Sequence, residues 1–131
     1  MFFVYQFMGF AILIYMINIE EQKTKLEAEK LTLREDLDTL GVQDDQGGWS
    51  VRPDEGDGVM ADPVDNADIT EDFEEKIARL NVLEAQYGQV LKALVAVETG
   101  TYGVCEVSGE AIREDRLMAL PSATTCIDHA A

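Results

Sequence analysis

The sequence predicts a mainly α-helical protein: an antiparallel coiled-coil hairpin of two helices, followed by a small C-terminal globule. Two observations predict the hairpin. Apolar residues recur every seven positions in two separate segments, and a long run rich in glycine and aspartate separates these segments. A third observation, a pair of short turns each containing one cysteine, predicts the globule. The length of 131 residues suits one domain, or a small domain with an extension.

The N-terminal segment, residues 1–18, differs from the rest by its apolar composition. Phe2 to Ile17 is interrupted only by Gln6 and Gly9, which is near the shortest length that spans a membrane. The segment lacks the basic start and the small-residue cleavage site of a secretory signal. Two interpretations stay open: a membrane anchor, or a start-site artefact with translation beginning at Met16.

The first hairpin helix is predicted from Ile19 to Leu40, because one apolar stripe runs through it and charged residues occupy its other faces. Gly41 ends this helix. The second helix is predicted from about Asn66 to Glu98, with Gly100 closing it. The residues of the two stripes are Ile19, Leu26, Leu33 and Leu40 in the first helix, and Phe73, Leu80, Tyr87 and Leu94 with Ile77, Leu83, Val90 and Val97 beside them in the second.

Matching stripes on two helices predict that residues 19–100 fold back as a two-stranded coiled coil. An acidic loop, residues 41–66, forms the tip of the predicted hairpin, and loops of this length are usually functional or disordered. Trp49 is the large apolar residue in the first half of this loop, and we expect it to pack on a neighbouring helix.

Composition narrows the classes of function. Ten Lys and Arg residues stand against 26 Asp and Glu, which gives a net charge of -16. A chain this acidic repels the phosphate backbone of DNA, and we therefore expect no direct DNA binding. We expect a basic partner instead. Two cysteines cannot form a disulfide framework and indicate a reducing compartment, the cytoplasm. No phosphate-binding glycine loop and no nucleophile–base pair is present, so we expect no enzyme activity.

The C-terminal motif has the form Cys-x2-Ser-x17-Cys-x2-His, made by Cys105, Ser108, Cys126 and His129. Two such knuckles supply the donors of a tetrahedral zinc site, so residues 101–131 are predicted to form a zinc-ribbon-like globule. Serine is a poor ligand. Zn²⁺ is therefore held by three protein ligands, with water or Ser108 in the fourth position, or the globule has lost its metal and persists through apolar packing. The predicted core is Tyr102, Val104, Ile112, Leu117, Leu120 and Ile127.

This motif resembles the C-terminal zinc finger of the DksA/TraR family of bacterial transcription regulators. Further similar segments are Thr101–Cys105, Gly109–Ile112, Arg116–Leu117, Ala119–Pro121 and Ala123–Cys126. A second match is Asp62-Pro63-Val64-Asp65-Asn66-Ala67, which looks like the D-P-V-D-x-A segment at the tip of the family's coiled coil. The resemblance covers roughly residues 19–131 and resumes right after Met16, so we favour the start-site artefact over the anchor.

The resemblance implies a regulator that binds RNA polymerase through its secondary channel. The tip residues Asp62, Asp65 and Ala67 would act near the active site of the polymerase. From spacing alone, helix capping and turn formation around Pro63 explain Asp62 and Asp65 better, and the resemblance reverses that preference. Asn66 stands where well-known members carry arginine, which puts the depth of insertion in question. We expect a monomer, because the hairpin can pair with itself.

Two further hypotheses come from other classes of function. One is a membrane-anchored acidic coiled-coil scaffold, in which residues 1–18 insert into the bilayer. The other is a zinc-binding adaptor for an unrelated protein.

Overall fold

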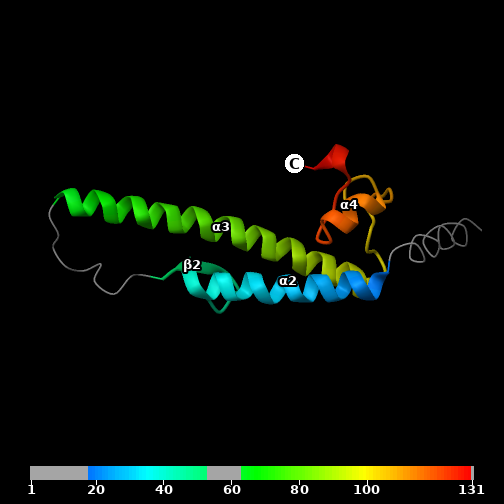
Figure 1. Ribbon diagram of the computed structural model, residues 1–131, viewed down its shortest axis with the longest axis horizontal. Helices are drawn as coiled ribbons and strands as arrows, with labels where there is room; N and C mark the ends of the chain where they lie inside the picture. The colour runs from blue at the N-terminus through cyan, green and yellow to red at the C-terminus, as the bar shows by residue number, and fades with distance from the viewer. Residues whose placement is uncertain (1–17, 53–62, 131) are drawn as a thin grey trace, which may run out of the picture. The chain divides into compact units, whose positions relative to one another are not determined.

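The computed structural model describes residues 18–52 and 63–130, with the backbone alone at 63–68. Among these residues, no helix is long and apolar enough to span a membrane. The elements, shown in Figure 1, are the helices α2 (Ile19–Leu40), α3 (Pro63–Thr99) and α4 (Glu114–Ala119), the strands β1 (Gly41–Gln43) and β2 (Trp49–Val51), and the 3-10 helix η1 (Ile127–His129). The apolar N-terminal segment, residues 1–18, lies outside the described residues except for Asn18.

The chain forms two compact units. One holds the described residues up to Leu31 together with those from Gly88 onward, and the other holds Thr32–Tyr87. Within each unit, a segment of α2 lies beside a segment of α3 that runs in the opposite direction (Figure 1). The prediction of a mainly helical fold with a helical hairpin is therefore confirmed.

Helix α2 has the predicted bounds. It begins after Asn18, whose side-chain oxygen accepts a hydrogen bond from the backbone N–H of Glu21 at 3.2 Å. Leu26 and Leu33 of the predicted stripe are buried, and so is Leu37 beside it, as expected for the inner face of α2. Ile19 and Leu40, at the two ends of the stripe, are half-buried.

A small β-hairpin occupies part of the predicted tip loop. Strands β1 and β2 pair antiparallel, with Gly41 opposite Val51. The turn between them is closed by Asp44, whose carboxylate accepts hydrogen bonds from the N–H groups of Gln46 (2.9 Å) and Gly48 (2.8 Å). Three-residue strands are too short to show a two-residue period, so the sequence pattern did not reveal them.

Two arginine side chains connect the β-hairpin to α2. The guanidinium of Arg34 lies 5.7 Å from the ring centre of Trp49, which confirms that Trp49 packs on a helix. Arg52 donates to the carbonyls of Asp38 and Gly41, both at 3.2 Å, and so satisfies carbonyl groups at the C-terminus of α2.

Helix α3 begins at Pro63, three residues before the predicted start, because proline is well suited to the first helical position. It ends before Gly100, which has φ 75° and allows the N–H groups of Thr101 and Tyr102 to donate back to the carbonyl of Ala96 (2.9 and 3.1 Å). Its buried residues are Leu80, Tyr87, Val90 and Ala93.

The predicted stripe of α3 is only partly buried. Phe73 and Ile77, which the seven-residue pattern placed in the core of the hairpin, are exposed. An added Cβ on Gly41 would lie 3.1 Å from the side chain of Leu80, so α2 ends at the level of Leu80 and α3 continues beyond it. Phe73 and Ile77 therefore have no facing helix in residues 18–52.

The C-terminal globule packs around Tyr102, Ile112 and Leu117, all buried. The Tyr102 hydroxyl donates to the carbonyl of Pro121 at 2.7 Å, and burial raises the pKa of Tyr102 to about 12. Two predicted core residues are not in this core: Leu120 is 45% exposed and Ile127 is 57% exposed. A globule this small has too little interior for six large apolar side chains.

Candidate functional site

The first knuckle is a tight turn around Cys105. The N–H of Cys105 donates to the carbonyl of Glu110 at 2.8 Å, and the N–H of Gly109 donates to the carbonyl of Cys105 at 2.9 Å. Gly109 has φ 71°, a backbone conformation that favours glycine. The turn holds Cys105 in the interior, at 1% exposure, and places Ser108 at the surface.

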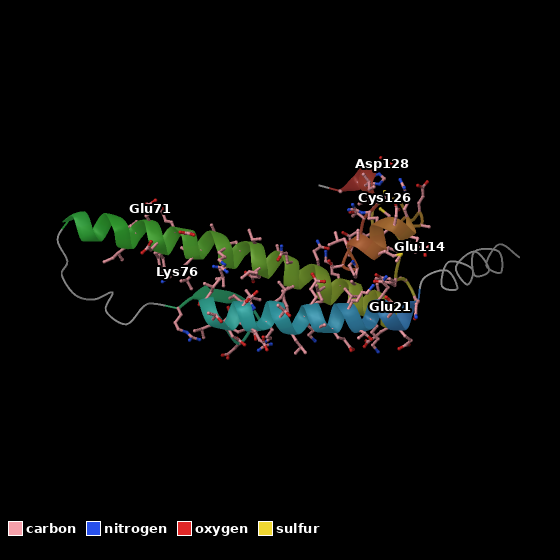
Figure 2. All side chains as sticks on the ribbon, viewed as in Figure 1. Glu21, Glu71, Lys76, Glu114, Cys126 and Asp128 are labelled. Carbon is pink, nitrogen blue, oxygen red and sulfur yellow. The ribbon has the colours of Figure 1, made fainter. Side chains whose placement is uncertain are left out.

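The second knuckle lies against the first. The N–H of Glu106 donates to the carbonyl of Thr124 at 2.9 Å, which joins the two turns. Arg116 of α4 donates to the carbonyl of Thr125 at 2.9 Å and holds the chain just before Cys126. The N–H of His129 then donates to the carbonyl of Cys126 at 3.1 Å. Figure 2 shows Cys126 close to Asp128 in this part of the chain.

Three donor atoms converge where the knuckles meet. The ligand atoms of Cys105, Cys126 and His129 all lie within 4.8 Å of one another. His129 Nδ1 is 3.9 Å from the sulfur of Cys105 and 2.8 Å from that of Cys126. Zn–S and Zn–N bonds of about 2.3 and 2.0 Å at a tetrahedral angle put S and N roughly 3.5 Å apart. The donor set fits zinc after a shift of less than about 1 Å between Cys126 and His129.

Ser108 acts on Cys105 as a hydrogen-bond donor. Hydrogen bonds from the Ser108 hydroxyl and backbone N–H lower the pKa of the Cys105 thiol from 9.0 to about 6, although burial opposes the shift. The Ser108 oxygen also accepts from the N–H of Glu110 at 3.4 Å. A thiolate is the form of cysteine that binds metal, so Ser108 prepares Cys105 for that role without supplying a strong donor itself.

The acidic residues near the knuckles stay outside the donor cluster. Glu106 and Asp128 are exposed, and Glu106 lies 4.0 Å from the ammonium of Lys92 on α3. Thr124 donates to Gln89 of α3 at 3.0 Å. Lys92 and Gln89 therefore connect the last turns of α3 to the finger, a link that sequence spacing did not suggest.

A groove of about 420 Å³ lies between the last turns of α3 and the finger. Its lining includes Ala93, Ala96 and Val104 together with the polar residues Lys92 and Glu106. No sequence pattern indicated this groove, because it depends on how two segments pack.

The predicted tip residues have a less complete structural account. Asp65 and Ala67 lie in the first turns of α3, described by their backbone alone. Asp62 lies outside the described residues. The structure thus brings together the predicted metal ligands, and it assigns helix to two of the three predicted tip positions.

A family model described as the prokaryotic dksA/traR C4-type zinc finger matches residues 100–128. The match ends one residue before His129, and two of the four cysteines expected of a C4 finger are Ser108 and His129 here. Uncharacterized protein YteA of Bacillus subtilis strain 168 is 45% identical over 69 residues, which are 51% of this chain and 28% of that protein. The chain therefore spans less than a third of the length of this relative.

Two solved structures are similar over most of their length. One is an RNA polymerase binding protein and transcriptional regulator, Dks, from Chlamydia trachomatis, with 24% identity, coverage of 85% of this chain and 80% of that one, and a TM-score of 0.45. The other is the transcription factor DksA2 from Pseudomonas aeruginosa, with 27% identity, coverage of 92% and 76%, and a TM-score of 0.46.

Proposed function

Because this chain belongs to the DksA/TraR family through its C-terminal finger, we propose that it is a transcription regulator that binds RNA polymerase and does not recognise DNA directly. The observation that supports this proposal most is that one chain combines the family's finger with a helical hairpin. The family's finger follows a helical hairpin, and the second helix of that hairpin begins within Asp62-Pro63-Val64-Asp65-Asn66-Ala67. The regulator works in the cytoplasm as a monomer.

The charge of the chain suits this role. A net charge of -16 opposes binding to duplex DNA and favours a basic channel that passes nucleotides. In the proposed mechanism, the hairpin end enters the secondary channel and Asp62, Asp65 and Ala67 act near the catalytic magnesium. Carboxylates delivered there change the stability of initiation complexes electrostatically, without chemistry of their own.

An initiation assay tests the role of the tip aspartates. We expect the parent chain to bind core polymerase and alter initiation, and Asp62→Asn/Asp65→Asn to lose most of that regulatory effect. Glu35→Gln/Asp36→Asn removes the same charge from exposed positions on α2 and should act like the parent. Equal activity of the tip variant and the parent contradicts the proposed role.

The finger is proposed to hold Zn²⁺ through Cys105, Cys126 and His129, with Ser108 beside the fourth position. Bound zinc would supply a crosslink between the two knuckles. The purified chain should contain about one zinc per molecule, and Cys126→Ser should contain none. Ser108→Cys adds a third thiolate as the fourth zinc ligand and should tighten zinc binding at least about tenfold. A metal content that does not change in Cys126→Ser contradicts the ligand set.

A further inference from the structure

An exposed apolar stripe lies on the N-terminal half of α3. Ile69, Phe73 and Ile77 are 43%, 42% and 37% exposed. Residues four positions apart on a helix share one face, so the three side chains form a continuous row, called here the α3 stripe. Glu71 and Lys76 mark this half of α3 in Figure 2.

The α3 stripe continues the face that packs on α2. Phe73 is seven residues from Leu80 and fourteen from Tyr87, both buried, so all three lie on one side of α3. Leu80 is level with Gly41, where α2 ends. From Leu80 back to Pro63, α3 extends by about 25 Å. Over this length α2 does not face the stripe, because it ends at Leu40.

Carboxylates border the stripe. Asp72 and Glu74, both exposed, are the sequence neighbours of Phe73 and lie about 100° to either side of it on the helix. Residues 63–79 contain the acidic residues Asp65, Asp68, Glu71, Asp72, Glu74 and Glu75, against the basic residues Lys76 and Arg79. The stripe is therefore apolar along its centre and negative at its margins.

Three kinds of occupant are compared for the α3 stripe: a second copy of the chain, residues 53–62 of the same chain, and another protein. Their charges distinguish them. A second copy would bring two sets of these carboxylates together, which is unfavourable. Residues 53–62 of the same chain contain Asp54, Glu55, Asp57 and Asp62 and no Lys or Arg, so they too would be repelled. A partner protein with an apolar face and a basic margin would bury the apolar centre of the stripe and pair its basic residues with the carboxylates at the margins.

We propose that the α3 stripe is a docking surface for RNA polymerase, and that it contacts an apolar face of the polymerase bordered by Lys and Arg. This inference rests on the proposed function and adds a surface to it, separate from Asp62 and Asp65. Phe73 is its central anchor, because aromatic residues at the centre of an interface dominate binding energy.

The test compares two faces of one helix in the full-length chain. Phe73→Gln/Ile77→Gln removes the stripe while keeping a good helix former at each position. The matched control is Val82→Gln, since Val82 is 57% exposed and lies about 180° from Phe73. Binding to core polymerase, measured as Kd, should weaken at least about tenfold for the stripe variant and less than about twofold for the control.

A second variant tests the margins of the stripe. Asp72→Asn/Glu74→Gln removes two charges with little change in shape. It should weaken binding and reduce the dependence of Kd on salt concentration. Circular dichroism should show the parent helix content for every variant, because the altered side chains are exposed.

The outcomes separate the two proposals. Parent affinity in Phe73→Gln/Ile77→Gln, or an equal loss in Val82→Gln, overturns the docking surface and leaves the proposed function standing. A parent chain that does not bind core polymerase overturns both. If the stripe variant binds weakly and Asp62→Asn/Asp65→Asn binds normally but does not regulate, the stripe serves docking and the tip serves regulation.

Discussion

The two halves of α3 share one sequence pattern and differ in environment. Leu80, Tyr87 and Val90 are buried against neighbouring segments of the hairpin. Ile69 and Phe73, on the same helix, are exposed and bordered by carboxylates. The difference arises because α2 ends at Leu40 while α3 extends back to Pro63. An apolar stripe thus stabilises the fold only where a facing element reaches it, and elsewhere it is available to a partner.

The largest expected effect is on the free energy of unfolding, and it compares the packed and the exposed halves of α3. Leu80→Ala removes a side chain that is 3% exposed and should lower the free energy of unfolding by about 3 kcal/mol. Phe73→Ala removes a larger side chain that is 42% exposed and should lower it by about 1 kcal/mol or less. Urea unfolding followed by circular dichroism measures both. If Phe73→Ala is the more damaging, the distal half of α3 is packed and the comparison fails.

Two glycines sharpen the comparison at the packed half of α3. Gly88 is inside the helix with no atom within 4 Å of an added Cβ, so Gly88→Ala should stabilise the chain by about 0.5–1 kcal/mol. Gly100 has φ 75° at the helix end, so Gly100→Ala should destabilise by about 1 kcal/mol. Thermal unfolding distinguishes the two. Changes of the same sign would mean that α3 does not end as described.

The last expected effect lies in the finger and depends on pH. Since the pKa of Cys105 is lowered from 9.0 to about 6, the folded chain releases this proton more readily than the unfolded chain. Metal-free protein should therefore gain stability as pH rises from about 6 to 9. Fluorescence-monitored unfolding in a chelator measures this slope. Cys105→Ser should lose it, and Ser108→Ala should reduce it, whereas identical slopes in all three contradict the contribution of Ser108.

Much of the helical hairpin could be predicted, because the bounds of a helix depend mainly on the residues within it and next to it. The seven-residue stripe and the glycine after it gave α2 its observed bounds. The burial of Phe73 and Ile77 could not be predicted, because a stripe does not reveal how far its partner helix extends. The predicted start of α3 was three residues late, since apolar periodicity gave less information there than Pro63 did.

In the finger, too, some features follow from sequence spacing and others depend on the folded geometry. Cysteine spacing predicted that Cys105, Cys126 and His129 come together, and their donor atoms lie within 4.8 Å of one another. Spacing gave Ser108 only the place of a weak ligand, whereas its hydroxyl and N–H both donate to Cys105. That contact depends on the geometry of the turn. Leu120 and Ile127 were assigned to the core by residue type alone, and the small globule leaves both exposed.

Site-specific photo-crosslinking tests the central claim, that the hairpin end acts inside the polymerase channel. One photoreactive residue replaces Ala67 at the start of α3, and another replaces Val107, which is 63% exposed in the finger. The account predicts that position 67 crosslinks to polymerase segments lining the secondary channel beside the catalytic magnesium and that position 107 does not. Crosslinks from position 107 in the channel, with those from position 67 elsewhere or absent, would contradict it.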